Sequence, residues 1–272
     1  MKNHKIIITV LILFIFNSCE KVIDIDLKNS EPQIVIDGTV NDQPGPYTVK
    51  ISKTGNYYKP STFPAVAGAE VTISDDAGNS EILSEVTEGF YQTSTIQGIP
   101  GRTYTLKVIA EGKEYTAVST MPEAVEIDSL NYEYQPGGSF GPDATEGYKL
   151  HIHFTDPAGI EDYCRFKVYK NGQLAKGYYL YNDKYTNGNS YDYNNFEDDA
   201  ILQLNDTAVV ELLTLDKVTY EYYYTLSNVL AEGDTGPPMM LTIPANPNSN
   251  LSNGALGYFG AFTVRCDSII IQ

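Results

Sequence analysis

Short runs of β-forming residues, separated at regular intervals by turn-forming residues, are the feature that most limits the fold of this chain. From Gln33 to Thr120 the sequence repeats stretches rich in Val, Ile, Thr and Tyr, each closed by Gly, Pro, Asn or Asp. Such punctuation is typical of β-sandwiches and barrels. We expect seven strands here, in QIVIDGTV, YTVKIS, AEVTIS, SEILSEV, GFYQTS, RTYTLKVIA and KEYTAVST.

The polarity within these runs alternates with a period of two. Val71 and Ile73, for example, alternate with Thr72 and Ser74. One face of such a strand enters a core while the other meets water. The sequence therefore predicts an all-β chain whose residues 33–122 form an immunoglobulin-like β-sandwich.

Residues 123–272 predict a second β-rich domain with longer loops and one short helix. Asp216 is placed to cap a helix that ends near Gly233, although the tyrosine-rich start of this segment would also suit a strand. The expected inner stripe of the helix is Val218, Tyr222, Leu226, Val229 and Leu230. Strands are expected in YKLHIHF, YCRFKVY, GYYLY, AILQL, AVVELLTL and FTVRCDSIII.

Residues 1–18 have the anatomy of a lipoprotein signal peptide. Lys2 and Lys5 precede an apolar run that is too short to span a bilayer, and Ser18 and Cys19 follow it. We expect Cys19 to become the lipidated first residue, with residues 19–32 as a polar tether. A plain secretory signal and an uncleaved N-terminal anchor are the alternatives.

The charge balance argues against nucleic-acid binding. The precursor carries a formal net charge of −17, and removal of Lys2 and Lys5 with the signal leaves 16 basic against 35 acidic side chains, or −19. A surface this acidic repels phosphate backbones. After the signal, no segment approaches the roughly 18 apolar residues of a membrane span, so we expect a soluble body tethered by its lipid.

Lipidation of Cys19 leaves two cysteines, Cys164 and Cys266. An oxidising envelope compartment would allow them to form a disulfide, and the alternative is a pair of free thiols. No C-x-x-C motif is present to suggest a zinc or redox site.

The sequence predicts no catalytic residues, no metal site and no cofactor, and hence no enzyme. His151 and His153 share a face of one expected strand and would need Asp156 or Asp162 to complete a metal site, whereas two histidines on a polar strand face require no metal. The paired acids match no calcium loop, and no G-x-S-x-G or phosphate-loop motif occurs.

One tyrosine-rich segment is the expected binding loop. Tyrosine supplies rigid contact area with a polar tip, and the interleaved Asn, Asp and Gly let a loop adapt to a partner. The alternative is a hairpin whose tyrosines fold back on the core. The candidate residues are Tyr178, Tyr179, Tyr181, Tyr185, Tyr191 and Tyr193.

Several stretches together resemble the Bacteroidota outer-membrane lipoproteins grouped as the domain of unknown function 4249 family. They are CEKVIDIDL, IVIDGTV, GFYQTSTIQGIPGRTYTLKV, the run from Asp156 to Tyr169, and NPNSNLSNGALGYFGAF. Cys164 stands where the family often has an aromatic residue, and the family offers no agreed catalytic residues to transfer. The resemblance implies an outer-membrane location and a TonB-dependent receptor as partner.

Together these features predict a non-enzymatic, lipid-anchored accessory protein of the outer membrane that assists ligand uptake. Its partners would be the membrane, through the N-terminal lipid, a TonB-dependent receptor, and a small-molecule or glycan ligand of unknown identity. A structural or adhesive surface lipoprotein is the first alternative. A glycan hydrolase that uses paired acids is the second.

Overall fold

The computed structural model describes residues 31–55, 63–137, 145–184, 188–234 and 246–272. The chain divides into two units, Met1–Glu31 and Pro32–Gln272, and the second contains all the elements described below. It is built mostly of strands, with one α-helix in the described residues, which confirms the predicted all-β class with one short helix.

The strands of the first half are β1 (Ile34–Asn41), β2 (Thr48–Lys53), β3 (Glu70–Asp75), β4 (Ser80–Ile82), β5 (Ser84–Thr87), β6 (Phe90–Gln92), β7 (Thr103–Ala110) and β8 (Lys113–Thr120). The second half contains β9 (Ile127–Gln135), β10 (Gly147–Thr155), β11 (Tyr163–Lys170), β12 (Gln173–Leu174), β13 (Tyr179–Asn182), β14 (Ser190–Tyr193), the 3₁₀ turn η1 (Asp198–Ala200), β15 (Thr207–Leu215), α2 (Lys217–Asp234) and β16 (Leu256–Ile270).

A nine-stranded mixed sheet joins strands from both ends of the sequence. Its order is β12-β11-β15-β16-β1-β2-β6-β5, with β13 also paired to β11. Two smaller antiparallel sheets, β14-β10-β9 and β4-β3-β7-β8, complete the structure.

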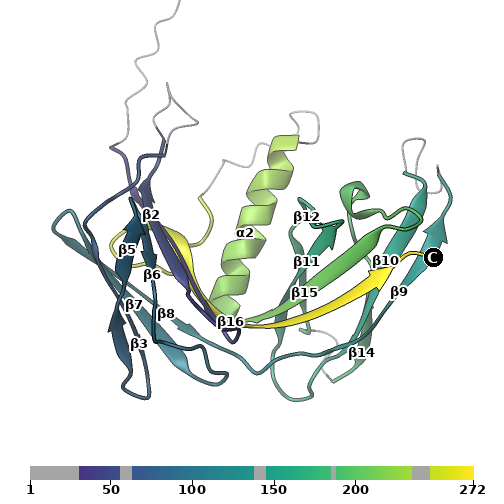
Figure 1. Ribbon diagram of the computed structural model, residues 1–272, viewed down its shortest axis with the longest axis horizontal. Helices are drawn as coiled ribbons and strands as arrows, with labels where there is room; N and C mark the ends of the chain where they lie inside the picture. The colour runs from purple at the N-terminus through teal and green to yellow at the C-terminus, as the bar shows by residue number, and fades with distance from the viewer. Residues whose placement is uncertain (1–30, 56–62, 138–144, 185–187, 235–245) are drawn as a thin grey trace, which may run out of the picture. The chain divides into compact units, whose positions relative to one another are not determined.

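The long strand β16 connects the two halves of the mixed sheet (Figure 1). Its first part pairs in parallel with β1, from Leu256 opposite Val35 to Phe262 opposite Asn41, and its second part pairs antiparallel with β15. Gly257 makes the parallel pairing fit, because a Cβ atom there would lie 2.0 Å from the carbonyl oxygen of Ile36, and its φ is +91°.

Two hydrophobic cores lie on one side of the mixed sheet. The first joins β1, β2, the start of β16 and the four-stranded sheet, and it contains Ile36, Ile51, Leu106 and Phe259. The second joins β11, β15 and the three-stranded sheet. The predicted alternation is confirmed in β7, where Tyr104, Leu106, Val108 and Ala110 are buried and the residues between them are partly exposed.

Helix α2 covers part of the opposite side of the sheet. Its predicted N-cap is confirmed, because Oδ1 of Asp216 accepts a hydrogen bond from the amide of Thr219 at 2.9 Å. The predicted inner stripe is right in part: Tyr222 and Leu226 pack against the sheet, but Val218 and Leu230 are 42% and 51% exposed. Thr219, Tyr220 and Tyr223 are buried instead, because the sheet presents an aromatic surface that the tyrosines match better than a narrow aliphatic stripe.

The expected strands differ from the observed ones in a few places. SEILSEV divides at Leu83 into β4 and β5, which belong to different sheets. AILQL forms only an isolated bridge between Leu202 and Tyr148. The strands β9, β12 and β14 were not expected, because their sequences are polar and their side chains are mostly exposed or half-buried.

Candidate functional site

The side of the mixed sheet that faces α2 is only partly covered, and a groove remains on it. Side chains at alternate positions of β1, β11, β15 and β16 point to this side, since the positions between them fill the two cores. The hollow has a volume of about 370 Å³. This is at the lower end of the range of small-molecule pockets.

The floor of the groove is apolar and its rim is polar. Leu213, Phe262 and Val264 form the floor and are almost fully buried. Thr39, Asn41 and Gln43 lie along the side formed by β1 and the turn after it, and Lys167, Tyr169, Glu211 and Cys266 lie on the other side. A ligand here would meet mainly polar rim groups above a largely buried apolar floor.

A small polar network crosses the rim. Tyr169 donates a hydrogen bond from its hydroxyl to Oε2 of Glu211 at 3.2 Å, and Nζ of Lys167 lies 3.4 Å from the same oxygen. Burial, followed by the nearby charge of Glu211, raises the pKa of Tyr169. The phenol therefore stays protonated at neutral pH, and the groove carries one cation, one anion and one neutral hydroxyl in direct contact.

An aromatic wall closes the groove at the α2 end. Tyr223 of α2 and Tyr258 of β16 share a hydrogen bond between their hydroxyls, and burial raises the pKa of both. Behind them the buried guanidinium of Arg165 lies 4.1 Å from the ring centroid of Tyr223 and 4.7 Å from that of Tyr178. These cation–π contacts stabilise the position of the Tyr223 ring in the wall.

The predicted tyrosine loop is largely part of the interior. Tyr179 and Tyr181 are only 4% and 7% exposed. Tyr191 and Tyr193 pack on the second core, where the ring of Tyr193 stacks on Phe166. Tyr178 contacts Arg165 behind the groove wall, and Tyr185 lies outside the described residues. Core packing accounts for these five described tyrosines, and a binding role for the segment stays a prediction.

His151 and His153 lie on the same face of β10, as expected, but the acidic side chain next to them is neither Asp156 nor Asp162. Their rings lie 6.4 Å apart on β10. His151 approaches Asp192 of β14 at 2.8 Å, and His153 lies 4.0 Å from the same carboxylate. The other acidic neighbour is Glu133, at 3.7 Å from His151, and neither Asp156 nor Asp162 forms an ion pair with the two histidines. His151 and His153 of β10 and Asp192 of β14 therefore form a row of interacting side chains across two paired strands.

Cys164 and Cys266 are free thiols in the structure. Cys164 lies on β11 and Cys266 on β16, with β15 between them. Strands separated by a third lie about 10 Å apart, beyond the Cα separation of about 7 Å that a disulfide tolerates. Burial raises the pKa of both thiols, which makes them poor nucleophiles. Cys19, the expected lipidation site, lies outside the described residues.

A second hollow, of about 330 Å³, places two carboxylates near Arg102. Burial would raise the pKa of Asp75 and Glu81, but hydrogen bonds from Asn79 and Arg102 lower that of Asp75, and those from residues 94–96 lower that of Glu81 to about 2. A glycosidase needs one carboxyl that stays protonated. Neither of these can serve as that acid.

Comparison with known proteins identifies the family. The family model described as "Domain of unknown function (DUF4249)" matches residues 20–267. The chain belongs to this family. No curated protein matches the sequence. Membership in the DUF4249 family confirms the predicted resemblance to this family, whose description names no reaction and no ligand.

None of the groove residues was predicted from the sequence to line a binding site. Tyr258 precedes the expected strand FTVRCDSIII, whereas Lys167, Tyr169 and Glu211 lie in expected strands. Their alternation with core residues marked them as facing away from the core. What the sequence did not show was that β1 and β16 would complete the same surface.

Among the described residues, no helix has both the length and the apolar character needed to cross a bilayer.

Proposed function

We propose that this DUF4249 protein is a lipid-anchored outer-membrane protein that binds a small molecule or glycan in the groove and presents it to a TonB-dependent receptor. The proposal includes no catalytic step. Its anchoring and location rest on the signal-like residues 1–18 and on Cys19. The receptor partner rests on the family resemblance.

The observation that carries the binding function is the groove itself. The two cores and α2 cover much of the mixed sheet, whereas this area leaves a hollow of about 370 Å³ whose apolar floor is buried and whose rim carries polar groups and Tyr169. Concave sites of this size, apolar with a few polar groups, are the usual form of a ligand pocket.

The lining also defines the chemistry of the ligand. Tyrosine rings offer flat apolar faces with polar tips, which suit the mixed surfaces of sugars and similar ring compounds. Lys167 and Glu211 add one charge of each sign, so the groove does not select strongly for an anion or a cation. A neutral, hydroxyl-rich ligand with an apolar face fits this combination best.

The same lining supports a non-enzymatic function. Glu211 is the one carboxylate among the described lining residues, and it is engaged by Lys167 and Tyr169. Sugar hydrolysis through paired acids requires a second carboxyl about 5 to 10 Å away. The thiol of Cys266 has a raised pKa, so it gives no nucleophile at neutral pH.

Native mass spectrometry of protein isolated from its own cell envelope tests the proposal. The wild type should carry a bound small molecule or oligosaccharide, and Tyr169→Ala should lose most of it. Tyr134→Ala is a matched control, because the Tyr134 hydroxyl also donates to a glutamate, Glu146, but on a different sheet. Equal ligand occupancy in all three proteins would contradict a binding function for the groove.

A further inference from the structure

Three aspartates from separate segments meet beside the second core. Asp156 follows β10, Asp162 precedes β11 and Asp183 follows β13. The pairing of β11 with β13 sets Tyr163 opposite Asn182, which brings the last two aspartates together, and the amide of Asp183 donates to the carbonyl of Asp162 at 3.2 Å. The amide of Gly188 donates to Oδ2 of Asp156 at 2.8 Å and holds the third in place.

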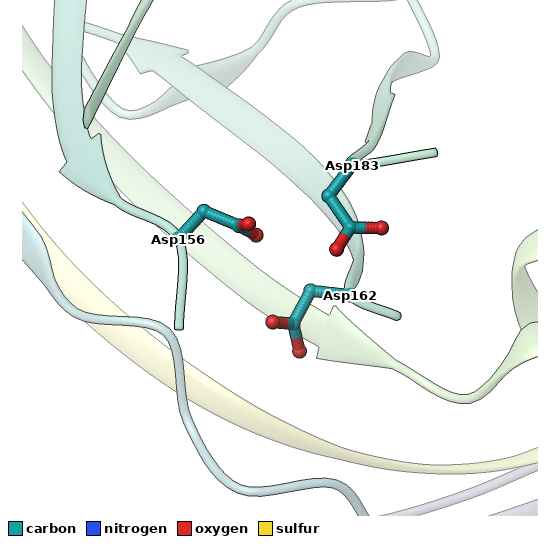
Figure 2. Close-up of side chains that lie close together, drawn as sticks. All are labelled: Asp156, Asp162 and Asp183. Carbon is teal, nitrogen blue, oxygen red and sulfur yellow. The ribbon is translucent and has the colours of Figure 1, made fainter. Parts of the chain in front are cut away.

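The three side chains lie close together (Figure 2), and all are buried. Asp156, Asp162 and Asp183 are only 2%, 5% and 1% exposed. One carboxylate oxygen from each lies within 4.8 Å of the other two. In the described part of the chain this is the one group of three or more acidic, histidine or cysteine side chains that converges in this way.

Two buried oxygens of the cluster have no hydrogen-bond donor. They are Oδ1 of Asp156 and Oδ2 of Asp162. A buried carboxylate oxygen without a partner is costly, and native structures satisfy nearly all such atoms. The arrangement therefore needs a positive charge or a shared proton.

The donor set identifies the kind of cation. All the donors are carboxylate oxygens, which favour hard cations over zinc or copper. Oxygens bound to one Ca²⁺ at 2.3 to 2.6 Å lie at most about 5 Å apart, which agrees with the spacing observed here. Mg²⁺ demands stricter octahedral geometry and keeps more of its own water. Three aspartates on three loop segments suit the larger and more tolerant ion.

We propose that Asp156, Asp162 and Asp183 bind one Ca²⁺ ion that ties β10, β11 and β13 together. Each aspartate lies two residues from a side chain of the second core, namely Phe154, Cys164 and Tyr181. The rings of Phe154 and Tyr181 are in edge contact, with centroids 5.1 Å apart. The ion holds the ends of these segments, so its effect is on stability and not on the groove.

Calcium titration of the intact mature protein tests this proposal. After treatment with a chelator at about pH 7.5, calorimetry should show one Ca²⁺ bound per chain, with a dissociation constant at or below the millimolar range of extracellular calcium sites. At about 100 times that constant, the melting temperature should rise by about 5 to 10 °C. Mg²⁺ at the same concentration should raise it less.

Asparagine variants separate an ion site from a shared proton. Asp156→Asn and Asp162→Asn should fold without calcium and lose at least tenfold in calcium affinity. Asp192→Asn, on the neighbouring strand β14, should respond to calcium as the wild type does. A wild type that binds no Ca²⁺ at about 10 mM, well above extracellular-type constants, would overturn the proposal even if a variant failed to fold. So would an unchanged calcium response in Asp162→Asn.

Discussion

The hydroxyl of Ser119 donates a hydrogen bond to Oδ2 of Asp216 at 2.7 Å, although 97 positions separate them in the chain. The same hydroxyl accepts a bond from the amide of Ala261 on β16, also at 2.7 Å. Asp216 meanwhile caps α2 through Thr219. One buried serine therefore connects strand β8, the start of α2 and the shared strand β16.

Replacement of this serine should weaken the whole fold. Ser119→Ala leaves the buried amide of Ala261 without its acceptor and removes a charge-assisted bond to Asp216, so the free energy of unfolding should fall by about 1 to 3 kcal/mol. Urea unfolding followed by circular dichroism measures this. The exposed Ser84→Ala serves as control, with an expected change within about 0.5 kcal/mol. Equal effects of the two substitutions would contradict the linking role of Ser119.

The parallel pairing of β1 with β16 should depend on Gly257. In Gly257→Ala the new methyl group would overlap the carbonyl of Ile36, so we expect a loss of about 3 kcal/mol or more, or failure to fold. Gly254 also has a positive φ, of +74°, but a Cβ atom there has no neighbour within 4 Å.

Gly254→Ala is the control, and it should cost only about 1 to 2 kcal/mol, the strain of the left-handed backbone. Thermal unfolding of both variants gives the comparison. A Gly257→Ala protein as stable as Gly254→Ala would show that β1 and β16 do not pair in this register.

Acid should remove the contribution of Glu81. Hydrogen bonds from residues 94–96 lower its pKa in the folded protein to about 2, from an ordinary value of 4.5. Because the folded pKa is the lower one, the stabilisation is fully present above about pH 4.5 and is lost as the pH falls toward 2. Glu81→Gln should therefore be less stable than the wild type near neutral pH by about 2 kcal/mol.

The difference between the wild type and Glu81→Gln should shrink as the pH approaches 2, where the wild-type carboxyl takes up its proton. Urea unfolding midpoints measured in steps across this range check the prediction. A difference that does not change with pH would mean that the carboxylate form of Glu81 is not what holds residues 94–96.

Membrane attachment should depend on a single sulfur atom. Cys19→Ala should release the protein from the membrane fraction or leave it as an unprocessed precursor, because the acyl chains would have no attachment site. Mass spectrometry of the wild type should find a lipidated peptide that begins at Cys19. If the variant keeps both its size and its membrane retention, the lipid-anchor proposal is wrong.

The strands were predictable where polarity alternated strongly, as in β3 and β7, and the cap of α2 followed from Asp216 alone. The polar strand β9 was not predictable, because it is stabilised by backbone hydrogen bonds to β10, which its own sequence does not indicate. The pairing of β1 with β16 is a contact between the two ends of the chain, and no local pattern encodes such a contact.

The site was harder to predict than the fold. A cluster of tyrosines in the sequence suggested an exposed loop, but Tyr181 and Tyr193 are part of the second core. Deletion of residues 181–194 would test a binding role for this segment, but it would also remove β14 and core side chains. Substitutions in the groove are therefore a cleaner test of ligand binding. Asp183 gave no signal in the sequence, because only the β11–β13 pairing brings it to Asp162.

The central proposal, an accessory role beside a TonB-dependent receptor, is tested most directly by quantitative recovery of the tagged protein from native envelopes after mild cross-linking. We predict strong enrichment of a TonB-dependent receptor with the wild type over an untagged strain, and undiminished enrichment with Tyr134→Ala. Recovery of a correctly lipidated, membrane-bound protein without any TonB-dependent receptor would contradict the account.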